Sequence, residues 1–255
     1  MLRTELHKLL PYRTAWVILL LFTGLLAATV AGAGGVNVNG QQLGQALYAL
    51  PGLWTNLTYL ASYFSLLPAF LLIMLITDEF QYRTFRQQVI DGASREQLVL
   101  DKLLVTALLV AWAVLSVLLV GAYFGLTRAA GASLPAVLAA APRPLLLYAA
   151  QLLGYLSLAA LLAVLIRKST PAIVALLLYV WVAERLIRYF LPDTIDRFLP
   201  IKALDILTPS PFAQTLDTVL GPSGALLPGE AVPVALAWAA LFWLLSAAVL
   251  RTRDL

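Results

Sequence analysis

The stretch LLVTALLVAWAVLSVLLVGAYFGL, residues Leu103–Leu126, runs for 24 residues without a charged side chain. A helix needs about 20 mostly apolar residues to cross a bilayer. This stretch therefore predicts a transmembrane helix, and it makes a membrane fold the first hypothesis for the whole chain.

Four further runs have the same character, and they are Thr14–Ala33, Tyr59–Thr77, Leu145–Ile166 and Ala231–Leu250. A fifth, Thr170–Leu191, is less clean because charged residues lie in its last third, and we count it as a span whose outer end reaches the interface. A strand of a membrane barrel would instead show about ten residues of alternating polarity. We therefore expect an all-α polytopic membrane protein, with six transmembrane helices in a single domain over residues 1–255.

The composition of the whole chain supports this interpretation. Of its 255 residues, 62% are hydrophobic and 12% are charged, and the mean hydropathy is +0.89. Soluble domains have about 45–50% apolar and about 25% charged residues. The chain has no cysteine and one histidine, His7, which excludes disulfides, cysteine nucleophiles and multi-histidine metal sites within one chain.

The basic residues lie in short clusters between the apolar runs, which is typical of topology determinants and does not indicate nucleic-acid binding. With the N terminus inside, 11 of the 17 basic residues fall in inner segments. The first outer loop, residues 34–58, has none. The sequence therefore predicts a multi-pass protein of the cell (inner or plasma) membrane with both termini in the cytoplasm.

The residues before the first span, Met1–Arg13, show an amphipathic pattern. Leu2, Leu6 and Leu9 share one helical stripe, and charged residues occupy the remainder. This pattern fits a helix that lies in the membrane interface. An ordinary charged flank of the first span fits it equally well.

The longest inner connection, residues 78–102, contains the signals for a sharp corner. Gly92 suits a helix stop. Ser94 suits an N-cap, with Gln97 placed to complete a capping box. We expect two helical pieces that meet near Gly92, project from the bilayer and keep the side chain of Arg95 in water. On these signals alone, a solvated loop with local caps remains the simpler interpretation.

Five residues of this connection resemble the signature of type-2 ABC transporter permeases, and they are Glu79, Thr84, Ser94, Arg95 and Lys102. The chain has Arg83 where many members have glycine before the threonine. The wider layout also resembles that family, with an amphipathic entry helix, six spans and a long outer segment before the last span.

The resemblance implies that the corner is a coupling helix, with Asp91, Gly92 and Glu96 at its tip, which docks into a separate nucleotide-binding ATPase subunit. No G-x-x-x-x-G-K-[ST] loop is present in the chain. We therefore expect no enzymatic activity and no cofactor in this chain, with ATP and Mg²⁺ on the partner subunit. The expected complex holds a second permease copy or a paralogue and contacts membrane lipid. Export is the expected direction, because members of that family usually move their substrates outward.

The outer segment, residues 192–230, is too long for a simple turn. Asp193 suits the cap of a short helix, and Ser210 with Pro211 suits the start of another that ends before Gly221. These pieces fit either outer helices pressed on or into the membrane, or a plain amphipathic loop.

Three charged residues, Glu184, Arg185 and Arg188, lie in the last third of the fifth span. Glu184 and Arg188 stand four residues apart and are able to pair. Charges at depth are costly and tend to mark pathways. The three residues therefore either anchor the outer boundary or line a route or gate.

Small-residue stripes, which allow close helix packing, occur at Gly24, Ala28 and Gly32 and again at Gly121 and Gly125. Such stripes are too common in membrane helices to locate a subunit interface.

The leading hypothesis is thus the permease subunit of an ATP-driven transporter. A secondary transporter or channel is the alternative, although the middle thirds of the spans contain no Asp, Glu, Lys, Arg or His. A membrane assembly subunit that transports nothing would use the same corner and also remains open.

Overall fold

The computed structural model describes residues 11–35, 47–82, 84–90, 92, 94–129, 133–211 and 226–252. Of the helical residues, 86 and 193 are described in their backbone only. Residues 1–10 of the expected interfacial helix lie outside the described part, as do Arg83 and Asp91. The helix expected after Ser210 falls on residues 212–220, which are also outside it.

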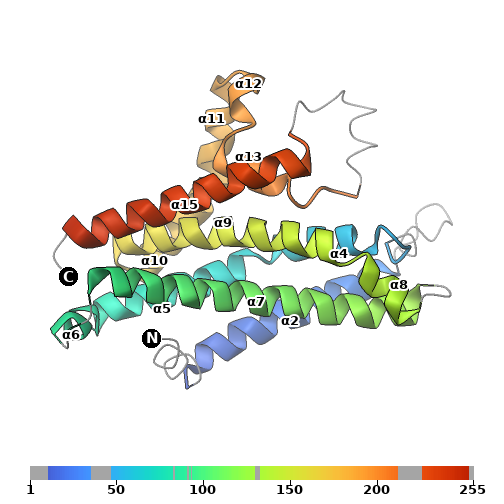
Figure 1. Ribbon diagram of the computed structural model, residues 1–255, viewed down its shortest axis with the longest axis horizontal. Coiled ribbons are helices and arrows are strands. Elements are labelled where there is room, and N and C mark those ends of the chain that lie inside the picture. Colours follow the sequence, from blue (N-terminus) through green and yellow to red (C-terminus); the bar gives the residue numbers. More distant parts are fainter. Residues whose placement is uncertain are drawn as a thin grey trace.

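The described chain is helical and contains no strand. Five helices are long and apolar enough to cross a membrane: α2 (Arg13–Ala33), α7 (Arg95–Arg128), α9 (Pro142–Ile166), the composite helix Ser169–Phe190 and α15 (Pro228–Thr252). A bent pair of helices makes six if it counts as one span. Figure 1 shows α2, α7, α9 and α15 running along the same long axis.

The second predicted span is not the single helix that was expected over Tyr59–Thr77. It consists of α4 (Leu53–Tyr63) and α5 (Leu66–Gln81), which meet at an angle of 44°. Pro68 explains the break, because it has no N–H to donate to the carbonyl of residue 64 and its ring would clash with that carbonyl.

The third span is longer than the apolar stretch that predicted it. The helix α7 runs unbroken for 34 residues, so Arg95–Lys102, expected in the inner connection, form its first two turns. Ser94 caps it as expected, with both hydrogen bonds of a capping box to Gln97. A short helix, α6 (Thr84–Ile90), precedes the corner, which confirms the expected pair of helical pieces.

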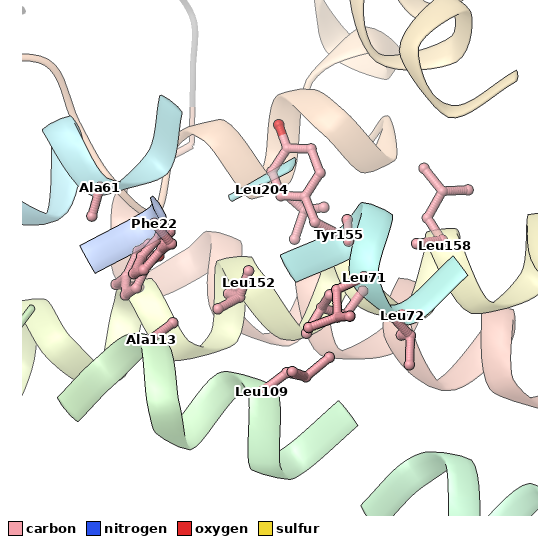
Figure 2. Packing of buried hydrophobic residues seen from close by; sticks show 14 of the residues in the cluster. Phe22, Ala61, Leu71, Leu72, Leu109, Ala113, Leu152, Tyr155, Leu158 and Leu204 are labelled. Atoms are coloured by element: carbon pink, nitrogen blue, oxygen red, sulfur yellow. The ribbon is translucent and has the colours of Figure 1, made fainter. Parts of the chain in front are cut away.

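The helix α9 lies at the centre of the bundle and packs against α4, α5, α7, α10 and α15. Figure 2 shows side chains from several helices meeting in this core, among them Leu71 and Leu72 of α5, Leu109 and Ala113 of α7 and Leu152 of α9. Central position explains why two thirds of the α9 span window is buried, against about a quarter for α2 and α15.

The two glycine stripes differ in what they face. A Cβ at Gly121 would overlap the ring of Trp54, and one at Gly125 would meet Val137. Val137 lies in α8 (Leu134–Ala139), a short helix that the sequence did not indicate. A Cβ placed at Gly24 or Gly32 would meet no atom of another helix within 4 Å. The second stripe thus packs within the chain, and only the first lacks a neighbour among the described residues.

The composite helix has three parts: α10 (Ser169–Leu178), the π-helical turn η1 (Tyr179–Ala183) and α11 (Glu184–Phe190). Figure 1 shows α11 projecting away from the bundle beside α12 (Asp193–Asp196). The chain then turns back to the bundle in α13.

The helix α13 (Pro200–Asp205) packs against both α9 and α15. Short helices in the outer segment are therefore confirmed. The expected cap at Asp193 is wrong, because Pro192 occupies the N-cap position and Asp193 is already helical.

Candidate functional site

The inner connection is anchored by a buried ion pair between two of the predicted residues. Lys102 Nζ lies 2.7 Å from Glu79 Oε1, and the side chains are only 4% and 9% exposed. The Lys102 ammonium also lies 5.7 Å from the centre of the Phe85 ring. Thr84 donates a hydrogen bond of 3.2 Å to the Glu79 carbonyl. The end of α5, all of α6 and the start of α7 therefore share one buried anchor.

The corner itself lies between α6 and α7, and we call Gly92–Glu96 the inner corner. Gly92 has a φ of 96°, in the left-handed region that favours glycine. Ser94 is exposed, and its capping box fixes the first turn of α7. A glycine in the left-handed region, followed closely by a capped helix, gives a sharp change of chain direction.

Arg95 does not extend into water as expected. Its Nη1 donates to the carbonyls of Leu250 and Arg251, at 2.8 and 2.7 Å. These carbonyls belong to the last turn of α15, the negative end of that helix dipole, where a cation is favourable. The adjacent Glu96 forms an exposed pair with Arg251 at 2.5 Å. The inner corner is thus tied to the last span, which lies 155 residues away in sequence.

Two other contacts gather further chain segments at the same end of the bundle. The Tyr12 hydroxyl donates to Asp78 Oδ2 at 3.0 Å. The Arg167 guanidinium lies 5.0 Å from the centre of the Phe80 ring. The described segments that the charge pattern placed on the inner side therefore meet at one end.

At the outer segment, Glu184 acts as an anchor. It is completely buried, and Arg188 Nη2 lies 2.6 Å from its Oε1, which confirms the expected pairing. The backbone N–H groups of Ile201 and Lys202 donate to the same carboxylate, both at 2.8 Å. Glu184 therefore caps the start of α13 and holds it against the composite helix.

Arg185 is exposed and is one of the residues that line a cavity of about 330 Å³. The cavity lies where the bend between α4 and α5 meets α9, the turn η1 and α13. We call it the polar cavity, and its main polar lining consists of Ser65, Gln151, Tyr155, Arg185, Asp205 and Thr208.

The polar cavity has a buried floor and an open mouth. Gln151 and Thr208 are 1% and 3% exposed, and Gln151 Oε1 has no hydrogen-bond partner among the described residues. At the mouth, Tyr63 and Trp181 are 62% and 56% exposed. Asp205 is exposed to the cavity and accepts a hydrogen bond of 2.7 Å from the Tyr155 hydroxyl.

The protein that encloses Asp205 on its other sides raises the pKa of this carboxyl above its usual value, since burial disfavours the charged form. The hydrogen bond from Tyr155 and the nearby Arg188 oppose this increase in the pKa. The cavity thus holds a carboxyl whose pKa is raised and, in Arg185, a permanently charged guanidinium.

The depth of this cavity could not be foreseen from the sequence. Gln151 lies nine residues after the start of α9 and Tyr155 lies 11 residues before its end. At about 1.5 Å per residue, both are roughly 14–17 Å from the ends of the helix, near its middle. Asp205 reaches this level from α13, a segment outside the predicted spans. The sequence singled out Arg185 as an anchor or as part of a route, and Gln151 is a lone amide in an apolar run, but nothing in the sequence singled out Asp205.

No group of three or more His, Cys, Asp or Glu side chains among the described residues could hold a metal ion. A family described as "Protein of unknown function (DUF2705)" matches residues 16–255. The chain belongs to this family. None of the curated proteins matches it.

Proposed function

We propose that this member of the DUF2705 family is the permease subunit of an ATP-binding cassette transporter, driven by a separate ATPase subunit. The proposed direction of transport is export. The observation that carries the proposal is the inner corner. It is a short polar projection that is held by the buried Glu79–Lys102 pair and by the contact of Arg95 with the end of α15. In this proposal the corner is the docking element for the ATPase, as the resemblance of Glu79, Thr84, Ser94, Arg95 and Lys102 implies.

A docking element has to transmit a push into the spans without bending. The Glu79–Lys102 pair supports the corner from within the bundle, and Arg95 links it to the end of α15. The helix α7 then continues for 34 residues, about 51 Å at 1.5 Å per residue. A displacement of the corner would therefore be carried along one rigid helix to the opposite end of the bundle.

The proposed topology has six spans, with α4 and α5 counted as one, and both termini in the cytoplasm. The proposed location is the cell membrane, that is, the inner or plasma membrane. The convergence of Tyr12, Asp78, Arg95, Arg167 and Arg251 at one end supports it. A basic cluster of this kind favours the cytoplasmic side. The working unit is proposed to hold two permease chains and two ATPase subunits.

The test uses the fact that the chain has no cysteine. Ser94→Cys is coupled to a photoreactive cross-linker in native membranes, and the captured protein is identified by mass spectrometry. We expect capture of an ATPase subunit, and stimulated ATP hydrolysis only when that subunit is present. The matched control is Ser133→Cys, at the exposed serine that precedes α8, beyond the far end of α7. Capture of no ATPase from Ser94, or equal capture from both positions, would contradict the proposal.

One observation favours the second candidate, a carrier that works without an ATPase. Asp205 accepts a hydrogen bond from Tyr155 near the middle of α9, where ion-coupled carriers place ionisable groups. Proteoliposomes that contain only this chain distinguish the two. Uptake of a cavity ligand that follows an ion gradient without ATP would favour the carrier, and uptake that requires the ATPase would favour the permease.

A further inference from the structure

We propose that the polar cavity binds a zwitterionic headgroup that carries an ammonium and a phosphate, as phosphatidylethanolamine does, and that the ligand enters sideways from the membrane. The inference does not depend on an ATPase partner, because it concerns binding by this chain alone.

The floor of the cavity requires a hydrogen-bond donor. A buried polar atom without a partner is costly, and such atoms are rare in native proteins. Gln151 Oε1 is such an atom, and the residue that carries it lines the cavity near the middle of the bundle. The ammonium group of an ethanolamine headgroup offers three N–H donors and would satisfy it.

The mouth of the cavity carries one charge of each sign. The Asp205 carboxylate suits an ammonium, and the Arg185 guanidinium suits a phosphate, to which its fork of N–H groups is well matched. A ligand with only a negative headgroup would meet Asp205, and a simple cation would meet Arg185. A ligand that carries both charges satisfies both groups.

The route of entry follows from the exposed aromatic residues. Tyr63 and Trp181 line the cavity and are more than half exposed on helices that are candidate membrane spans, so the cavity opens at the surface of these helices. Their rings also favour an ammonium through cation–π attraction. The π-helical turn, of a kind often found at functional sites, places Trp181 at this opening. A volume of about 330 Å³ suits a headgroup, since ligand sites range from about 300 to 1,000 Å³.

The experiment is a native mass spectrometry titration of the purified, delipidated chain. Its two ligands are phosphatidylethanolamine and phosphatidylglycerol with identical acyl chains. We expect one phosphatidylethanolamine per chain, bound at least tenfold more tightly than phosphatidylglycerol. Gln151→Leu and Asp205→Asn should each weaken that binding at least tenfold.

Two controls separate binding from folding. Gln81→Leu makes the same change as Gln151→Leu at the exposed inner end of α5, and it should bind like the wild type. Gln151→Leu removes an unpaired buried acceptor, so its thermal stability should not fall.

Competition with free phosphoethanolamine distinguishes the two sources of this chemistry. Displacement of the lipid indicates that the headgroup alone is recognised, and a failure to displace it indicates that the acyl chains are needed, with both results supporting the site. Equal affinity for the two lipids, or wild-type affinity in both cavity variants, would overturn the proposal.

Discussion

Gly154 of α9 lies directly against the side chain of Leu204 of α13, so closely that a Cβ at position 154 would overlap Leu204. Leu204 is completely buried. The missing side chain at Gly154 thus lets the outer segment approach the middle of the bundle. Asp205, the next residue, meets Tyr155 there and forms one side of the polar cavity.

The first prediction concerns this contact. Gly154→Ala should lower the free energy of unfolding by about 1–3 kcal/mol, the usual cost of overpacking, as measured by thermal unfolding in detergent. Gly24→Ala is the control, because it faces open space and gains helix propensity. Leu204→Ala should relieve the Gly154→Ala defect in part. Equal melting temperatures for the two glycine variants would show that the approach is not tight.

The buried ion pair makes the second prediction. Lys102→Met or Glu79→Gln alone should cost about 3–5 kcal/mol, because each breaks the buried ion pair from one side. The double variant with Glu79→Met should recover most of that loss, since an apolar pair avoids desolvation. The exposed Glu96–Arg251 pair is the matched control, and Arg251→Gln should change stability by about 0–1 kcal/mol. Chemical unfolding measures all of them, and additive losses in the double variant would contradict the pairing.

The third prediction concerns Arg95, which links the start of α7 to the end of α15. Arg95→Gln should expose the last turn of α15 by removing the donor to the carbonyls of Leu250 and Arg251. Hydrogen exchange should then speed up in the peptide that ends α15 and stay unchanged in the centre of α9. Glu96→Gln removes only an exposed pair and should leave this exchange rate close to wild type. If both variants behave alike, the tie has no effect on α15.

The fourth prediction tests the topology. Single cysteines at Ser94 and Ser133 precede α7 and α8, and both serines are exposed. A membrane-impermeant maleimide applied to intact cells should label Ser133→Cys and not Ser94→Cys. Both should react after the membrane is opened. Labelling of Ser94→Cys in intact cells would place the inner corner outside.

The fifth prediction concerns the pH dependence of the polar cavity. Burial raises the pKa of Asp205, and Glu184 adds to the increase, whereas Tyr155, Arg188 and Arg185 oppose it. An ammonium ligand requires the ionised carboxylate. Binding of phosphatidylethanolamine should therefore weaken as the pH falls through this raised pKa, at a higher pH than for an ordinary aspartate. Asp205→Asn should bind weakly at every pH in the titration, and a wild-type curve with no pH dependence would contradict this role.

The sequence alone was sufficient for features that depend on neighbours along the chain. The apolar runs such as Leu103–Leu126 predicted the long helices, because an uncharged run of that length has few alternatives to spanning a bilayer. The capping box of Ser94 and the pairing of Glu184 with Arg188 were also predicted, since each is set by a fixed helical spacing.

The tertiary structure decided the rest. It brought Arg95 to the end of α15 and Lys102 to Glu79, and it inserted Asp205 beside Gln151 near the middle of α9. The sequence located the ionisable residues by span, and by that measure the middle of the bundle was uncharged. Assigning residues to predicted spans cannot locate α13, because the position of this short helix depends on how closely its backbone approaches that of α9. At Gly154 that approach is permitted by the absence of a side chain, and its consequence for Asp205 appears only when α9 and α13 are packed together.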